Sequence, residues 1–429
     1  MGSIAKRRLF KSTLANYFGA AVLAALPIVT IPTYISSLGN LQWGLVGFMG
    51  TLQALLIVAD AGFSQVLIRE FAVRLSAGAA GAQRAAALLR SCERFYFLLL
   101  CVVLATAVVL SRVVADHWLK LPAGSRNLGA IAVVGGGLLC LLYVPGSLYR
   151  GVAMAGEEQV RFNMIVAAGA ILRFGGGAVV VSRWPHLEVY LVWFVAMLGI
   201  EVTARSILAW HVVGGRATAS YSRGELRQLI AGMGAWTIAA VIGAITIQMD
   251  KAILSRTIPI AALAAYYIAS QVAMGTLQVF SPMITAMLPA LLRPAENRQQ
   301  RSRDQLRLFS VILVLGMALI GAVWLVGRKL LGLWIGNQRA AEVAPILSVL
   351  LVGVCCNALC NVGYINWLAR DRRMKVLVVN IVALSMVIAL TLILVPKIGL
   401  KGAAIAWSAA QLCIFIMSLD WISDVVNGR

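Results

Sequence analysis

A single arginine stands at the centre of a long apolar segment. Arg173 is the one charged residue of Met164–Ser182, which reads MIVAAGAILRFGGGAVVVS. An arginine at the centre of a bilayer costs about 2.5–3.5 kcal/mol on insertion scales, so it faces a partner or a water-filled cavity. Its guanidinium keeps its charge and has a fork that fits phosphate oxygens. We interpret Arg173 either as a cavity charge for an anionic substrate or as a partner in a structural ion pair.

Carboxylates also occur inside apolar runs. Asp60 lies within IVADAGFSQVLIRE. Burial raises the pKa of such a carboxyl group toward neutrality, which suits a proton or ion coupling site. The alternative is a structural pair with an arginine such as Arg173. Glu201 and Arg205 are four residues apart and share one helical face, so we expect them to neutralise each other.

Asp250 and Lys251 follow the seventh apolar run. We expect them near the outer membrane surface, where charges need little explanation, with a role at a cavity mouth as the alternative. Uncharged polar residues also occur in the runs, where they serve either a pore or helix–helix contacts. They are Asn16, Gln53, Gln271 and Gln278.

The motifs that would indicate an enzyme do not occur in the sequence. It has no Walker motif, no phosphate-binding loop and no nucleophile paired with a base. Cys355, Cys356 and Cys360 lie in an apolar run without a nearby His, and free cysteine packs as a small apolar residue. We therefore predict no enzyme activity, no metal and no cofactor, apart from a coupling H⁺ or Na⁺.

The elements that position these residues must be membrane helices. Of the 429 residues, 61% are hydrophobic and 12% are charged, against about 25% charged in soluble domains. Uniformly apolar runs of about 20 residues match a bilayer-spanning helix. About twelve occur: Leu14–Ile35, Leu45–Leu67, Phe95–Val114, Leu128–Leu148, Met164–Ser182, Val189–Val212, Leu229–Met249, Ala262–Ala290, Leu308–Val326, Val343–Leu368, Val376–Val395 and Ala403–Ile422. The first run is too long for a signal peptide. Pro145, Gly135–Gly137 and Gly175–Gly177 are positions where bends are expected.

Positive charges set the expected orientation. If the N-terminus is cytoplasmic, 24 of the 37 Lys and Arg residues fall in inside segments and 11 in outside segments. Lys and Arg gather in cytoplasmic loops, so we predict that both termini are cytoplasmic. The same bias explains the net charge of +21, and we expect no nucleic-acid partner.

The pattern also indicates two halves. The longest basic inside loops follow the second and eighth runs, which are equivalent positions if the chain is two sets of six. We predict an N-terminal six-helix bundle at 1–213, a cytoplasmic linker at 214–228 and a C-terminal six-helix bundle at 229–429. Such parallel repeats are typical of transporters. Short outside segments speak against a glycan polymerase or ligase with a large external loop.

Four stretches carry a resemblance to a known family. They have a Leu-Gly turn after the first run, an Asp-x-Gly motif followed by Arg, an Asp before a Tyr-x-x-Ala helix start, and a Gly-Leu-x-Gly-Ala-Ala helix start. They are Ile31–Phe48 (IPTYISSLGNLQWGLVGF), Asp60–Glu70 (DAGFSQVLIRE), Gln248–Val272 (QMDKAILSRTIPIAALAAYYIASQV) and Leu394–Ala410 (LVPKIGLKGAAIAWSAA).

On these stretches the chain resembles the bacterial lipid-linked oligosaccharide flippases, the Wzx-type O-antigen translocase group. They belong to the multidrug/oligosaccharidyl-lipid/polysaccharide exporter superfamily, with the multidrug MATE exporters and the lipid II flippase. The resemblance implies an all-α polytopic protein whose two bundles form a MATE-like V. Spans one, two, seven and eight would line a central cavity, where Asp60, Arg69 and Asp250 match motif positions. Arg173, in the fifth span, departs from that lining.

The expected function is translocation of a polyprenyl-pyrophosphate-linked oligosaccharide, such as an O-antigen unit for lipopolysaccharide, across the bacterial inner membrane by alternating access. The alternatives are a cation-coupled multidrug exporter and a scaffold for other polysaccharide-assembly membrane proteins. The expected substrate-binding residues are Arg173, Arg69, Lys251, Asn16, Gln53 and Gln271. The expected ion-coupling or charge-pair residues are Asp60, Asp250, Glu201 and Arg205.

Overall fold

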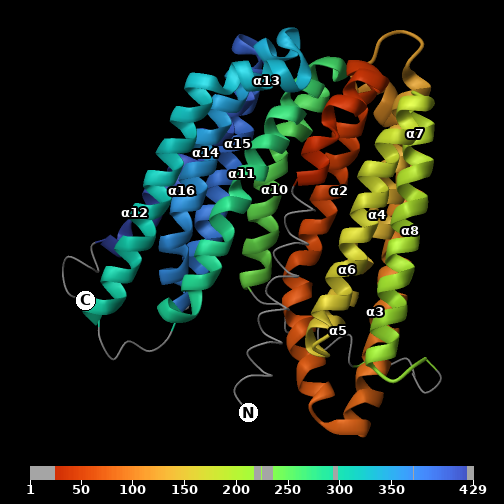
Figure 1. Cartoon of the computed structure of the whole chain (residues 1–429), viewed down its shortest axis with the longest axis vertical. Coiled ribbons are helices and arrows are strands. Elements are labelled where there is room, and N and C mark those ends of the chain that lie inside the picture. The colour runs from red at the N-terminus through yellow and green to blue at the C-terminus, as the bar shows by residue number, and fades with distance from the viewer. Residues whose placement is uncertain (1–24, 217–223, 225–234, 293–297, 371, 423–429) are drawn as a thin grey trace. The chain divides into compact units, whose positions relative to one another are not determined.

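The structure is a computed structural model that describes residues 25–216, 224, 235–292, 298–370 and 372–422. Inside the helices, only the backbone is described at 56–66, 235–237, 240, 281–282, 285–292, 298–302 and 369. The described elements are helical (Figure 1). The chain divides into two units, Met1–Thr237 and Ile238–Arg429. Much of the predicted first run lies outside the described residues.

The first unit is an antiparallel bundle whose helices run alternately between its two ends (Figure 1). Two of its spans contain a π-helical turn, and a third is split at a proline. Its elements are α2 (Ile31–Leu75), α3 (Gly78–Val113), the π-helix η1 (Val114–Trp118), α4 (Arg126–Tyr143), α5 (Pro145–Ala155), α6 (Gln159–Ala170), the π-helix η2 (Ile171–Gly176), α7 (Gly177–Arg183) and α8 (Leu187–Val212).

The predicted turn between the first two runs lies at Gly39. There the backbone leaves helical geometry, with φ of 73° and ψ of 174°. A positive φ is accessible to glycine at little cost because it has no Cβ. Pro32 occupies the first turn of α2, where its missing N–H is harmless. The helix–turn–helix expected for Ile31–Phe48 is therefore confirmed.

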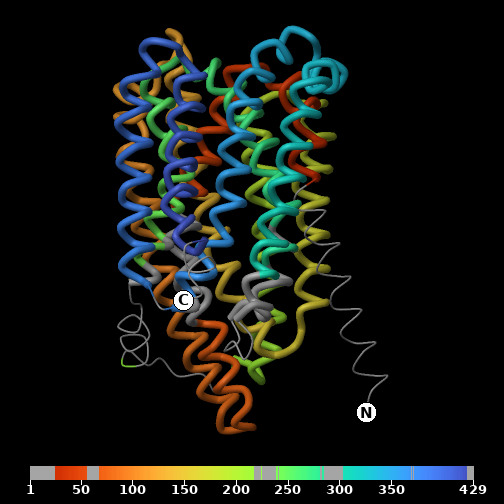
Figure 2. The backbone as a smooth tube through the Cα atoms, turned by 90° about the vertical axis from the view of Figure 1, so that its left-hand side faces the viewer, coloured from red at the N-terminus to blue at the C-terminus, as the bar shows by residue number. Residues whose placement is uncertain are grey.

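The predicted basic loop between the second and third runs is a helical hairpin. Helix α2 continues to Leu75, only Ser76 and Ala77 connect, and α3 begins at Gly78. The two arms meet closely, because a Cβ added at Gly81 would overlap the carbonyl oxygen of Arg74. Figures 1 and 2 show the hairpin extending beyond the ends of the other helices of its unit. The assignment of this segment as a loop was wrong.

Helix α4 contacts three neighbours through its glycine triplet. A Cβ added at Gly135 would lie 2.6 Å from Leu191 of α8, one at Gly136 would lie 3.1 Å from Leu52 of α2, and one at Gly137 would lie 2.8 Å from Ala107 of α3. The triplet therefore serves close helix packing and α4 does not break there. The break expected at Pro145 does occur, between α4 and α5.

The second unit has the same alternating course (Figure 1). Its elements are α10 (Ala235–Thr257), α11 (Ile260–Leu292), α12 (Arg298–Ala322), the π-helix η3 (Val323–Gly327), α13 (Arg328–Ile335), α14 (Asn337–Ala369), α15 (Arg373–Ile398) and α16 (Leu400–Ser418).

The apolar surface of both units indicates a membrane environment. Among the described residues, nine helical segments have the length and composition to cross a bilayer. Only 11% of the most apolar window is buried in Gly78–Trp118, and the same holds for Arg303–Ile335. Soluble monomers rarely expose apolar surfaces of that extent, so these helices face lipid. The predicted multi-pass, all-α class is confirmed, while the count of twelve spans and the cytoplasmic termini stay predictions.

Candidate functional site

Three charged side chains meet inside the first unit. Arg173 of η2 contacts Glu201 of α8, with Nη1 3.0 Å from Oε2. Arg205, one helical turn after Glu201, contacts the other carboxylate oxygen. The exposed fractions are 3% for Arg173, 2% for Glu201 and 7% for Arg205. We call these three residues the arginine–glutamate triad. The expected pair of Glu201 and Arg205 is confirmed, and Arg173 pairs with a carboxylate of another helix.

Two glycines make room for the triad. A Cβ added at Gly169 of α6 would overlap the Glu201 carboxylate, and a Cβ added at Gly146 of α5 would overlap the Arg205 guanidinium. At these two glycines, the backbones of α6 and α5 therefore pack directly against the charged groups. The triad occupies space that a side chain would otherwise fill.

Aromatic rings cover the two guanidinium groups. The Cζ atom of Arg173 lies 5.8 Å from the ring centre of Tyr143 and 5.4 Å from that of Phe174. Arg205 lies 5.3 Å from Phe162. Ring faces attract cations within about 6 Å. One carboxylate is shared by two guanidinium groups, so the triad carries a net charge of +1 that the rings partly offset.

The close approach of Gly169 to the Glu201 carboxylate gives a prediction for the stability of the protein. Replacing Gly169 by Ala should destabilise the protein by about 1–3 kcal/mol, because the added methyl group displaces the Glu201 carboxylate. The matched control is Gly199 of α8, where an added Cβ meets no atom within 4 Å. Gly199→Ala should be neutral or stabilising. Thermal unfolding in detergent measures both, and an equal decrease in the two variants would contradict the proposed steric cause.

A second charged cluster lies in the second unit. The Lys251 Nζ is 3.1 Å from the Asp250 Oδ1 and donates to the Ile247 carbonyl at 2.9 Å. The Tyr266 hydroxyl of α11 donates to the other oxygen of Asp250. Asp250 is 1% exposed and Lys251 is 5% exposed. Both side chains are buried in this unit, Asp250 is bonded to Tyr266 of α11, and α10 continues past them to Thr257. Their expected position near the outer membrane surface stays a prediction.

The other predicted site residues are dispersed. Arg69 is exposed on α2, and Gln53 of the same helix is half-buried. Gln271 is half-buried and donates to the Tyr267 hydroxyl at 2.9 Å. Asn16 and the Asp60 side chain lie outside what the structure describes. The substrate and coupling roles expected for these residues stay predictions.

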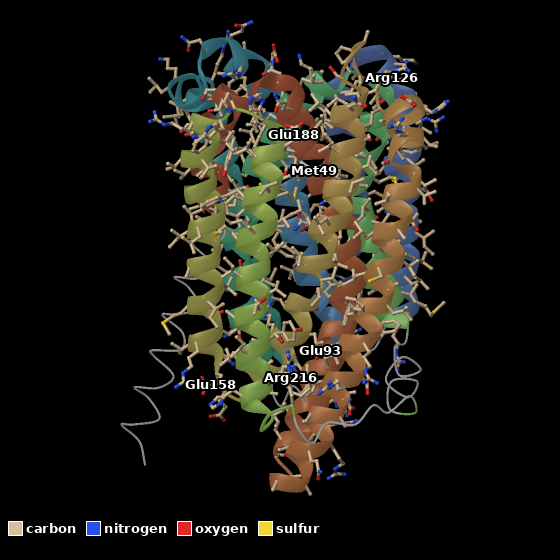
Figure 3. All side chains as sticks on the ribbon, turned by 90° about the vertical axis from the view of Figure 1, so that its right-hand side faces the viewer. Met49, Glu93, Arg126, Glu158, Glu188 and Arg216 are labelled. Atoms are coloured by element: carbon tan, nitrogen blue, oxygen red, sulfur yellow. The ribbon has the colours of Figure 1, made fainter. Side chains whose placement is uncertain are left out.

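Sequence analysis missed a third cluster, at one end of the first unit. Glu93 accepts hydrogen bonds from Tyr149 at 3.0 Å and from Trp210 at 2.9 Å. Arg90 and Arg216 each lie over the Trp210 ring, at 5.4 and 5.3 Å. Figure 3 shows Glu93 and Arg216 toward the same end of the unit. The cluster ties the chain after α8 to α3, and no spacing in the sequence indicates it.

The second unit has a similar cluster at one end. Asp420 accepts hydrogen bonds from Trp367 at 2.9 Å, Arg372 at 3.0 Å and Lys375 at 2.6 Å. Each unit thus has a carboxylate bonded to a tryptophan indole near a helix end. These clusters hold helix ends together.

The chemistry of the sites is ionic. No group of three His, Cys, Asp or Glu side chains suited to a metal occurs among the described residues. The two buried clusters can hold, exchange or compensate charge inside apolar bundles.

Comparisons with known proteins place this geometry in a fold. No protein-family model matches the chain. Over 191 residues, 44% of the chain, the sequence is 24% identical to a putative O-antigen transporter of Shigella flexneri. The match spans 45% of that protein, less than half of its length.

Solved structures match nearly the whole chain. The lipid II flippase MurJ in an inward closed conformation has a TM-score of 0.77 at 10% identity, covering 96% of this chain and 87% of MurJ. An inward-facing multidrug resistance MATE transporter has a TM-score of 0.72 at 12% identity, covering 95% and 94%. A MOP superfamily transporter from Pyrococcus furiosus has a TM-score of 0.59 at 13% identity, covering 95% and 98%.

The chain has the fold shared by MurJ and the MATE transporters, and its sequence is similar to that of a putative O-antigen transporter. The resemblance predicted from Ile31–Phe48 and the other stretches is confirmed at this level. MurJ and the MATE transporters are named for different cargoes, so the cargo must be argued from the charges of this chain.

Proposed function

We propose that the chain translocates a polyprenyl-pyrophosphate-linked oligosaccharide, an O-antigen or similar surface polysaccharide unit. Transfer would run from the cytoplasmic to the periplasmic leaflet of the bacterial inner membrane, by alternating access. The sugar and pyrophosphate would cross in a hydrated path while the polyprenyl tail stays in lipid. The observation that supports an anionic cargo is the charge balance of the buried groups.

Among the described residues, the buried carboxylates are those of Glu201 and Asp250. Glu201 is held by two arginines and Asp250 by Lys251. A charge moved out of water needs a partner of opposite sign that is not already neutralised. In the described spans, the surplus buried charge is the positive charge of the arginine–glutamate triad. This balance favours a pyrophosphate over a cationic cargo.

Ion coupling belongs to the same proposal. Return of H⁺ or Na⁺ would drive the cycle, with Asp60 as its carrier, because this carboxylate lies in a predicted span. Arg173 and Arg69 are the proposed positive charges for the substrate, and Lys251 would join them on leaving Asp250. Accumulation of lipid-linked oligosaccharide on the cytoplasmic face when the ion gradient is abolished would support coupling.

The second candidate is a cation-coupled multidrug exporter. The fold match to MATE transporters, with a TM-score of 0.72, supports it. A cationic drug requires an acidic or aromatic cavity, and in this candidate Asp60 would supply the acid. A deletion strain should then become sensitive to cationic drugs.

The deciding experiment uses a host that lacks this gene and any redundant flippase. Lipid-linked oligosaccharide is isolated, and a sugar-modifying probe that does not cross the bilayer reports the membrane face it occupies. We expect accumulation on the cytoplasmic face, relieved by the restored gene. Normal delivery to the periplasmic face, together with new drug sensitivity, would reject the flippase and support the drug exporter.

A further inference from the structure

The backbone that carries Arg173 is a π-helical turn. Helix α6 ends at Ala170, η2 covers Ile171–Gly176, and α7 continues from Gly177. A π-helical turn inside an α-helix is rare and occurs frequently at functional sites. In the wider turn, the residues around Arg173 have a different angular position from the one that a continuous α-helix would give them.

Two side chains from other helices bond the carbonyls on both sides of Arg173. The Tyr34 hydroxyl of α2 donates to the Phe174 carbonyl at 2.8 Å. The Trp193 indole N–H of α8 donates to the Leu172 carbonyl at 2.9 Å. The carbonyl groups of the two residues that flank Arg173 are thus each held by a donor from a separate helix.

Glycines give these donors their access. A Cβ added at Gly176 would lie 2.7 Å from the Trp193 ring, and one at Gly177 would overlap the Tyr34 hydroxyl. Gly175 lies between Phe174 and Gly176 in the sequence, and a Cβ added there would meet no atom within 4 Å. Two of the three consecutive glycines therefore fit the two donors.

Tyr34 also joins the two helical segments that meet at Gly39. Its ring stacks on Trp43, beyond that turn, at a centroid distance of 5.7 Å. The edge contacts are with Tyr190 at 5.5 Å and Phe194 at 6.2 Å, both on α8. Tyr34 is 1% exposed. A movement of the Gly39 turn would therefore be transmitted to the Phe174 carbonyl.

The register of η2 decides where Arg173 points. In an α-helix, one residue corresponds to about 100° of rotation and 1.5 Å of rise. If the π turn relaxed to α geometry, the guanidinium would turn away from Glu201 by an angle of that order. Glu201 would keep Arg205, which lies on its own helix, and the Arg173 charge would lose its partner.

We propose that Tyr34 and Trp193 are positioning residues for Arg173. They hold η2 in the register that pairs Arg173 with Glu201, and movement of the Gly39 turn releases the guanidinium as an anion-binding group during transport. The release step rests on the proposed transport of an anionic lipid-linked substrate. The positioning step does not depend on the substrate.

The first test uses hydrogen exchange on the purified chain without substrate. Tyr34→Phe removes one donor and keeps the ring, so amide exchange in 165–182 should rise about fivefold to tenfold, the factor expected for one net hydrogen bond. Trp193→Phe should act similarly. The control is Tyr149→Phe, which removes a partly buried hydrogen bond to Glu93 in the same unit and should leave exchange in 165–182 unchanged. Equal exchange in Tyr34→Phe and wild type would overturn the positioning claim.

The second test is a double-mutant cycle on transport. Arg173→Met leaves Glu201 paired with Arg205, so this variant should fold. If Tyr34 acts through Arg173, Tyr34→Phe lowers the transport rate at least threefold in the wild-type background and has no effect in Arg173→Met. If Tyr34 has only a structural role, Tyr34→Phe lowers the transport rate by the same factor in the wild-type and the Arg173→Met backgrounds. That result would overturn the release step. If the wild type moves no lipid-linked oligosaccharide, the proposed function fails, while the exchange experiment still decides the positioning claim.

Discussion

Replacing Glu201 by Gln should lower the free energy of unfolding by about 3–5 kcal/mol, the cost of breaking a buried ion pair by removing one partner. The carboxylate is shared by Arg173 and Arg205. Its loss leaves two buried guanidinium groups facing each other without a counter-charge. We expect a lower unfolding temperature in detergent and a lower yield of folded protein.

The control for this prediction is Glu188 of the same helix. Glu188 is exposed in the first turn of α8, so Glu188→Gln should cost less than about 1 kcal/mol. Adding Arg173→Met to Glu201→Gln should recover part of the loss, because one of the two unpaired charges is gone. If Glu201→Gln and Glu188→Gln unfold at the same temperature, the triad does not stabilise the bundle.

Replacing Asp250 by Asn should cost a similar amount, about 3–5 kcal/mol. The change leaves the buried Lys251 ammonium without its carboxylate, although the amide still accepts the hydrogen bond from Tyr266. Thermal unfolding and the fraction of monodisperse protein measure the effect.

A second change in the same chain separates charge from packing. Lys251→Met removes the stranded ammonium, so the double variant should be more stable than Asp250→Asn alone. The matched surface control is Glu342→Gln, because Glu342 is exposed on α14. A double variant less stable than Asp250→Asn would show that Lys251 stabilises α10 through its hydrocarbon stem and its bond to Ile247.

The sequence predicted that Arg173 needs a partner, but not which one. The cost of an arginine in an apolar segment can be derived from composition alone. The distance between Arg173 and Glu201 depends on how η2 packs against α8, and a pairing between two helices leaves no periodic signal. The Glu201–Arg205 pair was predictable because a spacing of four residues fixes its geometry on one helix.

Two errors have a common physical cause. A span predicted from hydropathy is ended at the first charged residue, whereas a helix ends where its backbone hydrogen bonds end. The seventh span was therefore ended at Met249 although α10 continues to Thr257. The Ala-rich stretch from Gly78 was assigned to a loop because it carries arginines, although alanine and arginine favour helix strongly.

The positioning roles of Tyr34 and Trp193 could not be predicted from the sequence, for a different reason. A π-helical turn differs from an α-helical turn by one residue, and no residue pattern marks that difference. Gly175–Gly177 beside Arg173 was the available signal, and sequence analysis took it only as a possible bend. Tyr34 belonged to a recognised turn motif, but its bond to Phe174 joins residues 140 positions apart.

The glycine triplet of α4 acts as a three-way spacer. Adjacent positions on a helix point about 100° apart, so Gly135, Gly136 and Gly137 set the distances to α8, α2 and α3 independently. One methyl group added at each position in turn would push a different neighbour outward. Three chemically identical substitutions would therefore distort the bundle in three directions, each toward a different neighbour of α4.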